Sequence, residues 1–225
     1  VLRGLRDEYK LGRSPRKGEE LSKDMEDYLF TNLKDKIPGY FMAQTSDELC
    51  SRSGVTRQQA DEFAMLSHHR TEKSIDSRIF ENEVIDVITP DGIVSVSDED
   101  HFVRGTTLES LTNLRTHFGP DSLVTAGNAS GVVDGAAAVI LKSAKKASED
   151  GDEPLARIVS WGVVGLDPAI MAYGPVPSSR LALERAGLSV QDIDRWEINE
   201  VFSGQLVACV KDLEIDISKV NVNGG

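Results

Sequence analysis

The sequence has 225 residues, enough for one large domain or two small ones, and its hydrophobic content of 40% is ordinary for a globular protein. A net charge of −12 argues against nucleic-acid binding, which normally depends on a basic surface, and no apolar run approaches the roughly 18 residues of a membrane span. Two cysteines without clustered histidines predict neither a disulfide framework nor a metal site, and they favour a reducing, intracellular setting.

The first clear helix is predicted to begin at Thr56. Thr56 and Gln59 form a capping box, in which each side chain satisfies a free backbone amide, and apolar residues follow at spacings of three and four. His68 and His69 lie on this helix and point in different directions, so we expect ordinary polar contacts rather than a shared metal ion. Weaker apolar spacing predicts an earlier helix over residues 21–33.

Strands are expected to alternate with helices, which favours a layered α/β architecture. Alternating apolar residues around a Pro-Asp-Gly turn predict a hairpin with strands at 83–88 and 93–97. The continuous apolar run AAAVIL, residues 136–141, predicts a strand buried on both faces, and ARIVSWGVVG and WEIN predict strands at 156–165 and 196–199. Further helices are predicted at residues 108–114, 142–151, 176–187 and 201–213.

The stretch VTAGNASGVVDGAAAVIL, residues 124–141, places a turn of very small residues directly before the AAAVIL run. Glycines and small side chains let a ligand approach the backbone, and Asn128 and Ser130 add groups that form hydrogen bonds. Tight turns before core strands have the same composition, so the turn alone does not decide between a binding site and a packing requirement.

A second candidate site lies in RWEINEVFSGQLVACV, where Asn199 and Glu200 end a predicted strand just before a helix. Ligands of open α/β sheets usually bind at strand ends, and helix N-terminal amides favour developing negative charge. An asparagine there can orient a water molecule or donate toward an oxyanion, but it can also simply cap the helix.

Several motifs in the same order resemble the thiolase family of acetyl-CoA acetyltransferases and 3-ketoacyl-CoA thiolases. They are the two stretches above together with SGVTRQQADEFAMLSHHR, VRGTTLESLTNLR, ARIVSWGVVGLDPAIMAYGPVPSSRLALERAGL and VNVNGG, and they run from about Gly39 to Gly225. The resemblance implies a layered α/β fold, here partial, with a loop domain inserted in the first of two similar domains. It assigns residues 1–118 to the loop domain, 119–154 to the end of the N-terminal domain and 155–225 to the start of the C-terminal domain.

The resemblance also implies an acyltransferase that forms or cleaves 3-ketoacyl-CoA by moving an acyl group to or from coenzyme A. Coenzyme A is then a substrate, and no metal or redox cofactor is expected. Thiolases work as dimers or tetramers, so we expect a homodimer or homotetramer with no nucleic-acid or membrane partner. The family is compatible with a cytoplasmic, mitochondrial or peroxisomal location.

By the same resemblance, the small turn lines the coenzyme A channel, with Ala126 and Ser130 at positions that contact the pantetheine arm. Asn199 matches the asparagine of the family's NEAF motif, which holds a water that helps to form an oxyanion hole. Phe202 matches the phenylalanine of that motif, which packs beside the reacting group. Arg104 resembles an arginine that approaches the nucleotide end of coenzyme A.

Met42 matches the methionine of a family motif, YHMGxTAE, that covers the acyl pocket. Here the motif reads YFMAQTSDE, so Phe41 replaces a histidine and Ala43 replaces a glycine. NEVF in place of NEAF adds the bulk of Val201 beside the oxyanion site. These departures support an alternative, a thiolase-like protein that binds acyl-CoA or assembles with partners without catalysis.

The chain starts at Val1 and stops at Gly225, and we expect it to be a segment lacking both ends of a thiolase. The family's nucleophilic cysteine belongs to a segment before Val1, and its GHP histidine and second cysteine belong after Gly225. Cys50 and Cys209 lie among core-forming residues, where burial keeps a thiol protonated and inert. We therefore expect both to be structural and the segment alone to be inactive.

Overall fold

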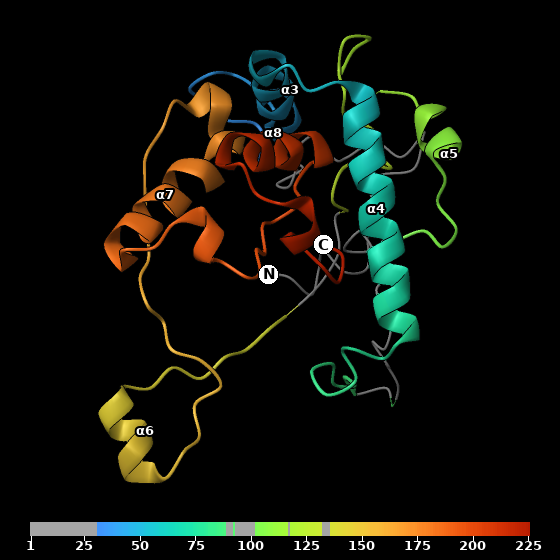
Figure 1. Ribbon diagram of the computed structural model, residues 1–225. Helices are drawn as coiled ribbons and strands as arrows, with labels where there is room; N and C mark the ends of the chain where they lie inside the picture. Colours follow the sequence, from blue (N-terminus) through green and yellow to red (C-terminus); the bar gives the residue numbers. More distant parts are fainter. Residues whose placement is uncertain (1–30, 89–91, 93–101, 117, 132–135) are drawn as a thin grey trace, which may run out of the picture.

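The computed structural model describes residues 31–88, 92, 102–116, 118–131 and 136–225. The regular elements of this part of the chain are helices; the short 3-10 helices η1 and η2 lie between them, and η3 follows the last α-helix (Figure 1). The elements are α3 (Met42–Ser53), α4 (Arg57–Asp76), α5 (Leu108–Thr112), α6 (Ala144–Asp150), η1 (Pro168–Tyr173), α7 (Pro175–Ala186), η2 (Val190–Asp192), α8 (Ser203–Leu213) and η3 (Ile217–Lys219).

The helices form where local sequence signals predict them. The backbone N–H of Gln59 donates to Thr56 Oγ1 (3.3 Å), and Gln59 Oε1 accepts from the Thr56 backbone N–H (2.9 Å), which confirms the capping box of α4. Gly151 and Gly187 end α6 and α7 in the left-handed conformation, with φ of 72° and 67°. The predicted helix at 21–33 lies largely outside the described residues.

Helix α8 lies at the centre of the described structure, between α7 and α4 and beneath α3 in the view of Figure 1. Leu206 and Cys209 on this helix are completely buried. An added Cβ on Gly204, in the first turn of α8, would lie 2.8 Å from Sγ of Cys50 and 3.6 Å from Cβ of Ala60. The absence of a side chain at Gly204 therefore lets α8 approach α3 and α4 closely. The main core surrounds α8 and contains Phe63, Val176, Trp196, Ile198, Leu206, Cys209, Val210, Leu213, Ile215 and Val220.

The predicted strands are wrong for the described residues, which contain three isolated bridges and no longer strand. The segment 136–141, predicted as doubly buried, is extended and exposed, with Ile140 88% accessible. The segment 156–165 is also extended, and these two stretches lead to and from α6 at the edge of the structure (Figure 1). The first arm of the hairpin, 83–88, forms no strand, and the second arm lies outside the described residues.

The physical reason is that a strand needs a neighbour, whereas a helix satisfies its own backbone. The apolar residues of 136–141 and 156–165 are typical of strands, but no described segment pairs with them. Segment 156–165 does contact α7, because Ser160 Oγ donates to the Ala182 carbonyl (2.6 Å). WEIN keeps a single parallel bridge, between Trp196 and Val220. No helix in the described part of the chain combines the length and apolarity needed to cross a bilayer.

Candidate functional site

The structure brings parts of the two candidate motifs together, although residues 142–194 separate these motifs in the sequence. The backbone N–H of Ser130 donates to the Val201 carbonyl (2.9 Å), and the backbone N–H of Ser203 donates to the Asn128 carbonyl (2.9 Å). Ala129 and Phe202 form an antiparallel bridge between these two bonds. The small turn and the NEVF segment therefore form one short ladder at the beginning of α8.

The side chains that a ligand would meet are accessible at this ladder. Ala126, Ser130 and Asn199 are exposed, and Phe202 is half-buried. The residue that precedes the first turn of α8 is Phe202 rather than Asn199, so Asn199 does not cap the helix. One of the two explanations for Asn199 is thereby removed, and its amide is available for a ligand or a water molecule.

Asn128 differs from the expectation that its amide serves a ligand, since it is 5% exposed and holds the turn instead. Its Oδ1 accepts from the Thr125 backbone N–H (2.8 Å), and its Nδ2 donates to the Leu123 carbonyl (2.9 Å) and to Asp61 Oδ1 (2.8 Å). Nothing in the sequence connects Asp61, on a helical face, with this turn. The one sequence feature that hints at a buried Asp61 is its place next to Ala60, an apolar residue of that helix that the structure buries.

The smallness of the turn also has a packing cause. An added Cβ on Gly127 would lie 2.5 Å from Cδ2 of Leu111 and 2.6 Å from Cδ1 of Leu114. Gly127 thus faces the α5 region, whereas Ala126 and Ser130 face outward. Packing therefore explains the small residue at Gly127, whereas the exposed positions Ala126 and Ser130 have no such packing requirement, and their contact with a ligand stays a prediction.

The NEVF segment is fixed from the other side by Asn221, which is 1% exposed. Asn221 Oδ1 accepts from the Ile198 backbone N–H (2.8 Å), and Nδ2 donates to the Ile198 carbonyl (2.8 Å) and to Glu200 Oε1 (2.7 Å). Burial raises the pKa of the Glu200 carboxyl, while hydrogen bonds from Ser67 and Asn221 act in the opposite direction. Glu200 is therefore a partly buried acid directly beside Asn199.

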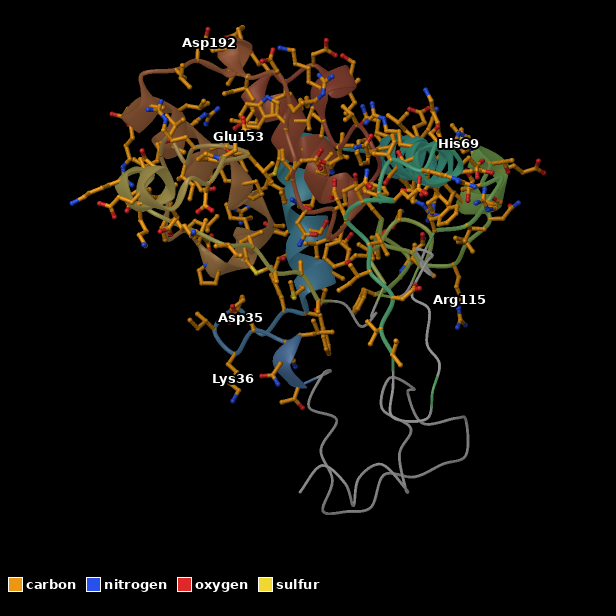
Figure 2. The ribbon with its side chains drawn as sticks, turned by 90° about the horizontal axis from the view of Figure 1, so that it is seen from below. Asp35, Lys36, His69, Arg115, Glu153 and Asp192 are labelled. Carbon is orange, nitrogen blue, oxygen red and sulfur yellow. The ribbon has the colours of Figure 1, made fainter. Side chains whose placement is uncertain are left out.

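Helix α4 contacts the turn and the loop before α5 through its two histidines. His68 Nδ1 accepts from the Val103 backbone N–H (3.2 Å), so its Nε2 carries the hydrogen that faces the Gly127 carbonyl (3.3 Å). His69 lies on the α5 side of α4 (Figure 2), with Nε2 2.7 Å from the Thr106 carbonyl. The prediction that both histidines make ordinary polar contacts is confirmed.

Arg104 lies in the loop that His68 contacts, but its guanidinium already has partners. Nη1 is 3.0 Å from Asp76 Oδ1 and 3.5 Å from Glu72 Oε1, and the group stacks 5.2 Å from the Phe102 ring centroid. The hydrogen bond to Asp76 raises the pKa of Arg104. A phosphate ligand would have to compete with these two carboxylates for the arginine.

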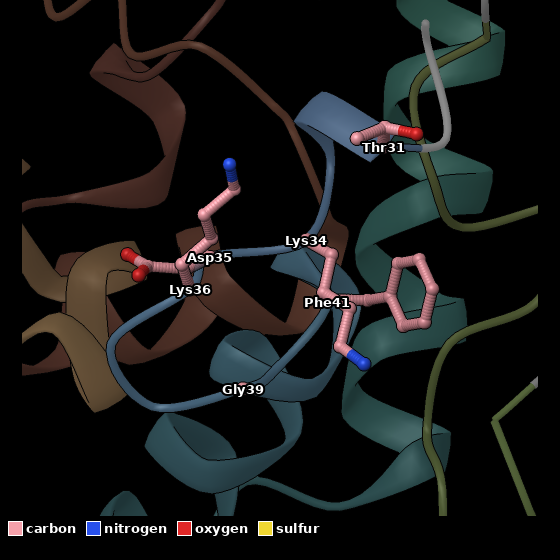
Figure 3. Close-up of a pocket in the computed structure, with 6 residues that line it drawn as sticks. All are labelled: Thr31, Lys34, Asp35, Lys36, Gly39 and Phe41. Carbon is pink, nitrogen blue, oxygen red and sulfur yellow. The ribbon is translucent and has the colours of Figure 1, made fainter. Parts of the chain in front are cut away.

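Met42 is the half-buried first residue of α3. Its backbone N–H donates to the Leu33 carbonyl (3.0 Å) rather than to the small turn that contains Ala126 and Ser130. Phe41, just before it, lines a hollow of about 550 Å³. Figure 3 shows the Phe41 ring projecting away from Asp35 and Lys36. The Phe41 ring lies 5.6 Å from that of Phe118, centroid to centroid. The other residues that line the hollow are Thr31, Lys34, Asp35, Lys36 and Gly39.

Both described thiols are unsuited to nucleophilic catalysis, as expected. Burial raises the pKa of Cys50 to about 11 and that of Cys209 to about 12. Cys209 donates to the Ala172 carbonyl with an Sγ to O distance of 3.6 Å. Among the described residues no group of three or more His, Cys, Asp or Glu side chains could hold a metal ion.

The chain matches two family models that divide it almost completely between them. Residues 7–145 match the thiolase N-terminal domain, and residues 152–225 match the thiolase C-terminal domain. The chain belongs to the thiolase family. The resemblance that the motifs indicated is therefore confirmed.

Individual thiolases agree with this assignment. The chain is 45% identical to an acetyl-CoA acetyltransferase of Rhizobium meliloti over 195 residues, which cover 86% of the chain and 50% of that protein. It is 42% identical to the human mitochondrial 3-ketoacyl-CoA thiolase over 217 residues, which cover 95% of the chain and 55% of that protein. The chain thus spans about half the length of the curated thiolases it matches.

Solved thiolase structures show the same fold. The crystal structure of the human mitochondrial 3-ketoacyl-CoA thiolase matches 95% of the chain with a TM-score of 0.86 and 40% identity, and the chain covers 55% of it. The acetyl-CoA acetyltransferase of Bacillus anthracis matches 96% of the chain, with a TM-score of 0.85 and 38% identity, and the chain covers 54% of it. The predicted thiolase-like fold, present in part, is confirmed. The human enzyme has also been solved in complex with CoA, and that structure matches with a TM-score of 0.85.

Proposed function

We propose that the protein containing this chain is a thiolase-type acyltransferase that moves an acyl group to or from coenzyme A, forming or cleaving a 3-ketoacyl-CoA. The observation that supports this most strongly is the ladder between residues 128–130 and 201–203, which joins the segment of accessible Ser130 to the segment that follows accessible Asn199. This arrangement supports a site in which a hydroxyl serves an amide-bearing ligand arm and an amide serves a developing oxyanion.

In this proposal each site residue has a separate task. Ala126 leaves space for the pantetheine arm, and the Ser130 hydroxyl hydrogen-bonds one of its amides. Asn199 orients a water molecule that stabilises the oxyanion, and the half-buried ring of Phe202 shields the reacting group. The assigned binding residues also include Arg104 for the nucleotide end and Met42 for the acyl group.

The nucleophile of such a reaction does not come from the two described thiols, because burial keeps both protonated. We keep the division into a loop domain at 1–118, the end of the N-terminal domain at 119–154 and the start of the C-terminal domain at 155–225 as part of the proposal. Assembly as a homodimer or homotetramer belongs to it as well, and light scattering of the full-length protein tests that part.

The alternative is a thiolase-like acyl-CoA binder without catalysis. Two observations favour it: an aromatic ring at Phe41 replaces a polar family residue, and Val201 adds bulk at the ladder. It predicts coenzyme A binding in a protein that neither forms nor cleaves 3-ketoacyl-CoA.

The test is to purify the protein from the complete coding sequence and to measure both coenzyme A binding and thiolysis of acetoacetyl-CoA. We expect Asn199→Ala to lower kcat about 100-fold with little change in coenzyme A affinity. Ser130→Ala is expected to weaken coenzyme A binding about fivefold. Ser148→Ala, at an exposed serine on α6, is the matched control and should change neither quantity. Binding without thiolysis would support the alternative, and absence of both would refute the proposal.

A further inference from the structure

We infer that Asp61, on α4, is a positioning residue for the turn that carries Ala126 and Ser130, and that it acts through the side chain of Asn128. The inference rests on the proposed function, because it concerns the affinity of that turn for coenzyme A. Asp61 lies outside the site residues assigned above.

Asp61 is completely buried, which is costly for a carboxylate unless charge and hydrogen bonds compensate. Arg57 Nε donates to Asp61 Oδ2 (2.7 Å), and Asn128 Nδ2 donates to Asp61 Oδ1 (2.8 Å). Arg57 also donates through Nη2 to the carbonyl of Leu111 (2.8 Å), a residue whose side chain packs against Gly127. Asp61 therefore joins α4 to the turn through Asn128, and its partner Arg57 joins α4 to Leu111 on α5.

The Asn128 amide has a defined orientation. Its oxygen accepts from the Thr125 backbone N–H, and its two hydrogens go to Asp61 and to the Leu123 carbonyl. A carboxylate only accepts hydrogen bonds, so it selects the amide orientation in which the nitrogen faces α4. The reverse orientation would set oxygen against the carboxylate and nitrogen against the Thr125 N–H. Asp61 thus supports, together with the Thr125 N–H and the Leu123 carbonyl, the amide orientation that closes the turn.

The backbone of Asn128 links this arrangement to the site. The Asn128 carbonyl accepts the Ser203 amide of α8, and the next residues, Ala129 and Ser130, pair with Phe202 and Val201. A change in the Asn128 side chain therefore moves Ser130 relative to the segment that carries Asn199. The consequence we expect is a loss of coenzyme A affinity that exceeds any loss of kcat.

The experiment measures the dissociation constant of coenzyme A by titration calorimetry on the full-length protein. We expect Asp61→Asn to weaken binding about fivefold, because it keeps the shape but leaves one oxygen where Arg57 Nε and Asn128 Nδ2 now each have an acceptor. Glu62→Gln makes the same chemical change one residue along on the exposed side of α4 and should leave affinity unchanged.

A second variant separates positioning from general stability. Asn128→Asp places two carboxylates where a donor and an acceptor now lie 2.8 Å apart. Two acceptors then face each other, and neither can donate the hydrogen bond that Asn128 Nδ2 now supplies. Asn128→Asp should therefore bind coenzyme A more weakly than the wild type does.

The exchange variant Asp61→Asn/Asn128→Asp restores a donor opposite an acceptor. It should bind coenzyme A more tightly than Asn128→Asp, because the two positions again form a hydrogen bond. Wild-type affinity in Asp61→Asn would overturn the inference, even if the variant unfolds more easily. Should Asn128→Asp fail to fold, Asp61→Asn and Glu62→Gln alone decide. A wild-type protein that does not bind coenzyme A would instead refute the proposed function.

Discussion

Replacement of Gly204 by alanine tests the close approach of α8 to its neighbours. The new methyl group would lie 2.8 Å from Sγ of Cys50 and 3.6 Å from Cβ of Ala60. Optimal contact distances between non-bonded carbon atoms are about 3.5–4.0 Å and sulfur is larger, so the overlap with Cys50 is about 1 Å. Cys50 is 1% exposed and Ala60 is 1% exposed, which leaves the sulfur little space to move.

The expected magnitude follows from two opposing effects. Overpacking of a dense core costs about 1–3 kcal/mol, and replacing glycine in a helix gains at most about 1 kcal/mol. The gain is smaller for Gly204 because it lies in the first turn of α8. We expect a net loss of about 1–2 kcal/mol in the free energy of unfolding. The Ser203 to Asn128 hydrogen bond lies next to the displaced turn, so coenzyme A affinity should also fall.

The assay is urea denaturation of the full-length protein for Gly204→Ala, Cys50→Ala and the double variant. Cys50→Ala removes the overlapping sulfur, and the methyl group introduced by Gly204→Ala then occupies part of that space. The double variant should therefore be more stable than the sum of the two single effects predicts, by at least about 1 kcal/mol. Wild-type stability in Gly204→Ala, or strict additivity in the double variant, would refute the packing argument.

Two further predictions concern titratable groups. With pKa values of about 11 and about 12, Cys50 and Cys209 should resist iodoacetamide in the native protein at about pH 8 and react fully in urea, as peptide mapping would show. Labelling of either thiol at the rate of a free cysteine in the native protein would contradict this. Burial raises the pKa of Glu200 in the folded state. The folded state therefore binds a proton at Glu200 more tightly than the unfolded state does. The stability that this proton contributes is lost as the pH rises above the ordinary glutamate pKa of about 4.3. Glu200→Gln should therefore gain stability relative to the wild type as the pH rises, and urea midpoints measured across that range would show it. If the two midpoints differ by the same amount at every pH, the argument about Glu200 is refuted.

The helices could be predicted from the sequence because their causes are local. The Thr56 capping box lies within four residues. The glycines that end α6 and α7 adopt the left-handed backbone conformation, which glycine allows because it has no Cβ. The strands could not be predicted in the same way. The composition of 136–141 is typical of a buried strand, but a strand forms only when another segment supplies its hydrogen bonds.

For the site, the sequence by itself determined the chemical groups: small residues in the turn, a hydroxyl at Ser130 and an amide at Asn199. The tertiary structure decided which of them are available. It exposes Ser130 but buries Asn128, and it gives Gly127 a packing role against leucines near α5. The contact between Asp61 and Asn128 spans 67 positions. The spacing of apolar and polar residues along the chain carries no information on such a pair. The two side chains become buried and hydrogen-bonded only when helix packing brings them together.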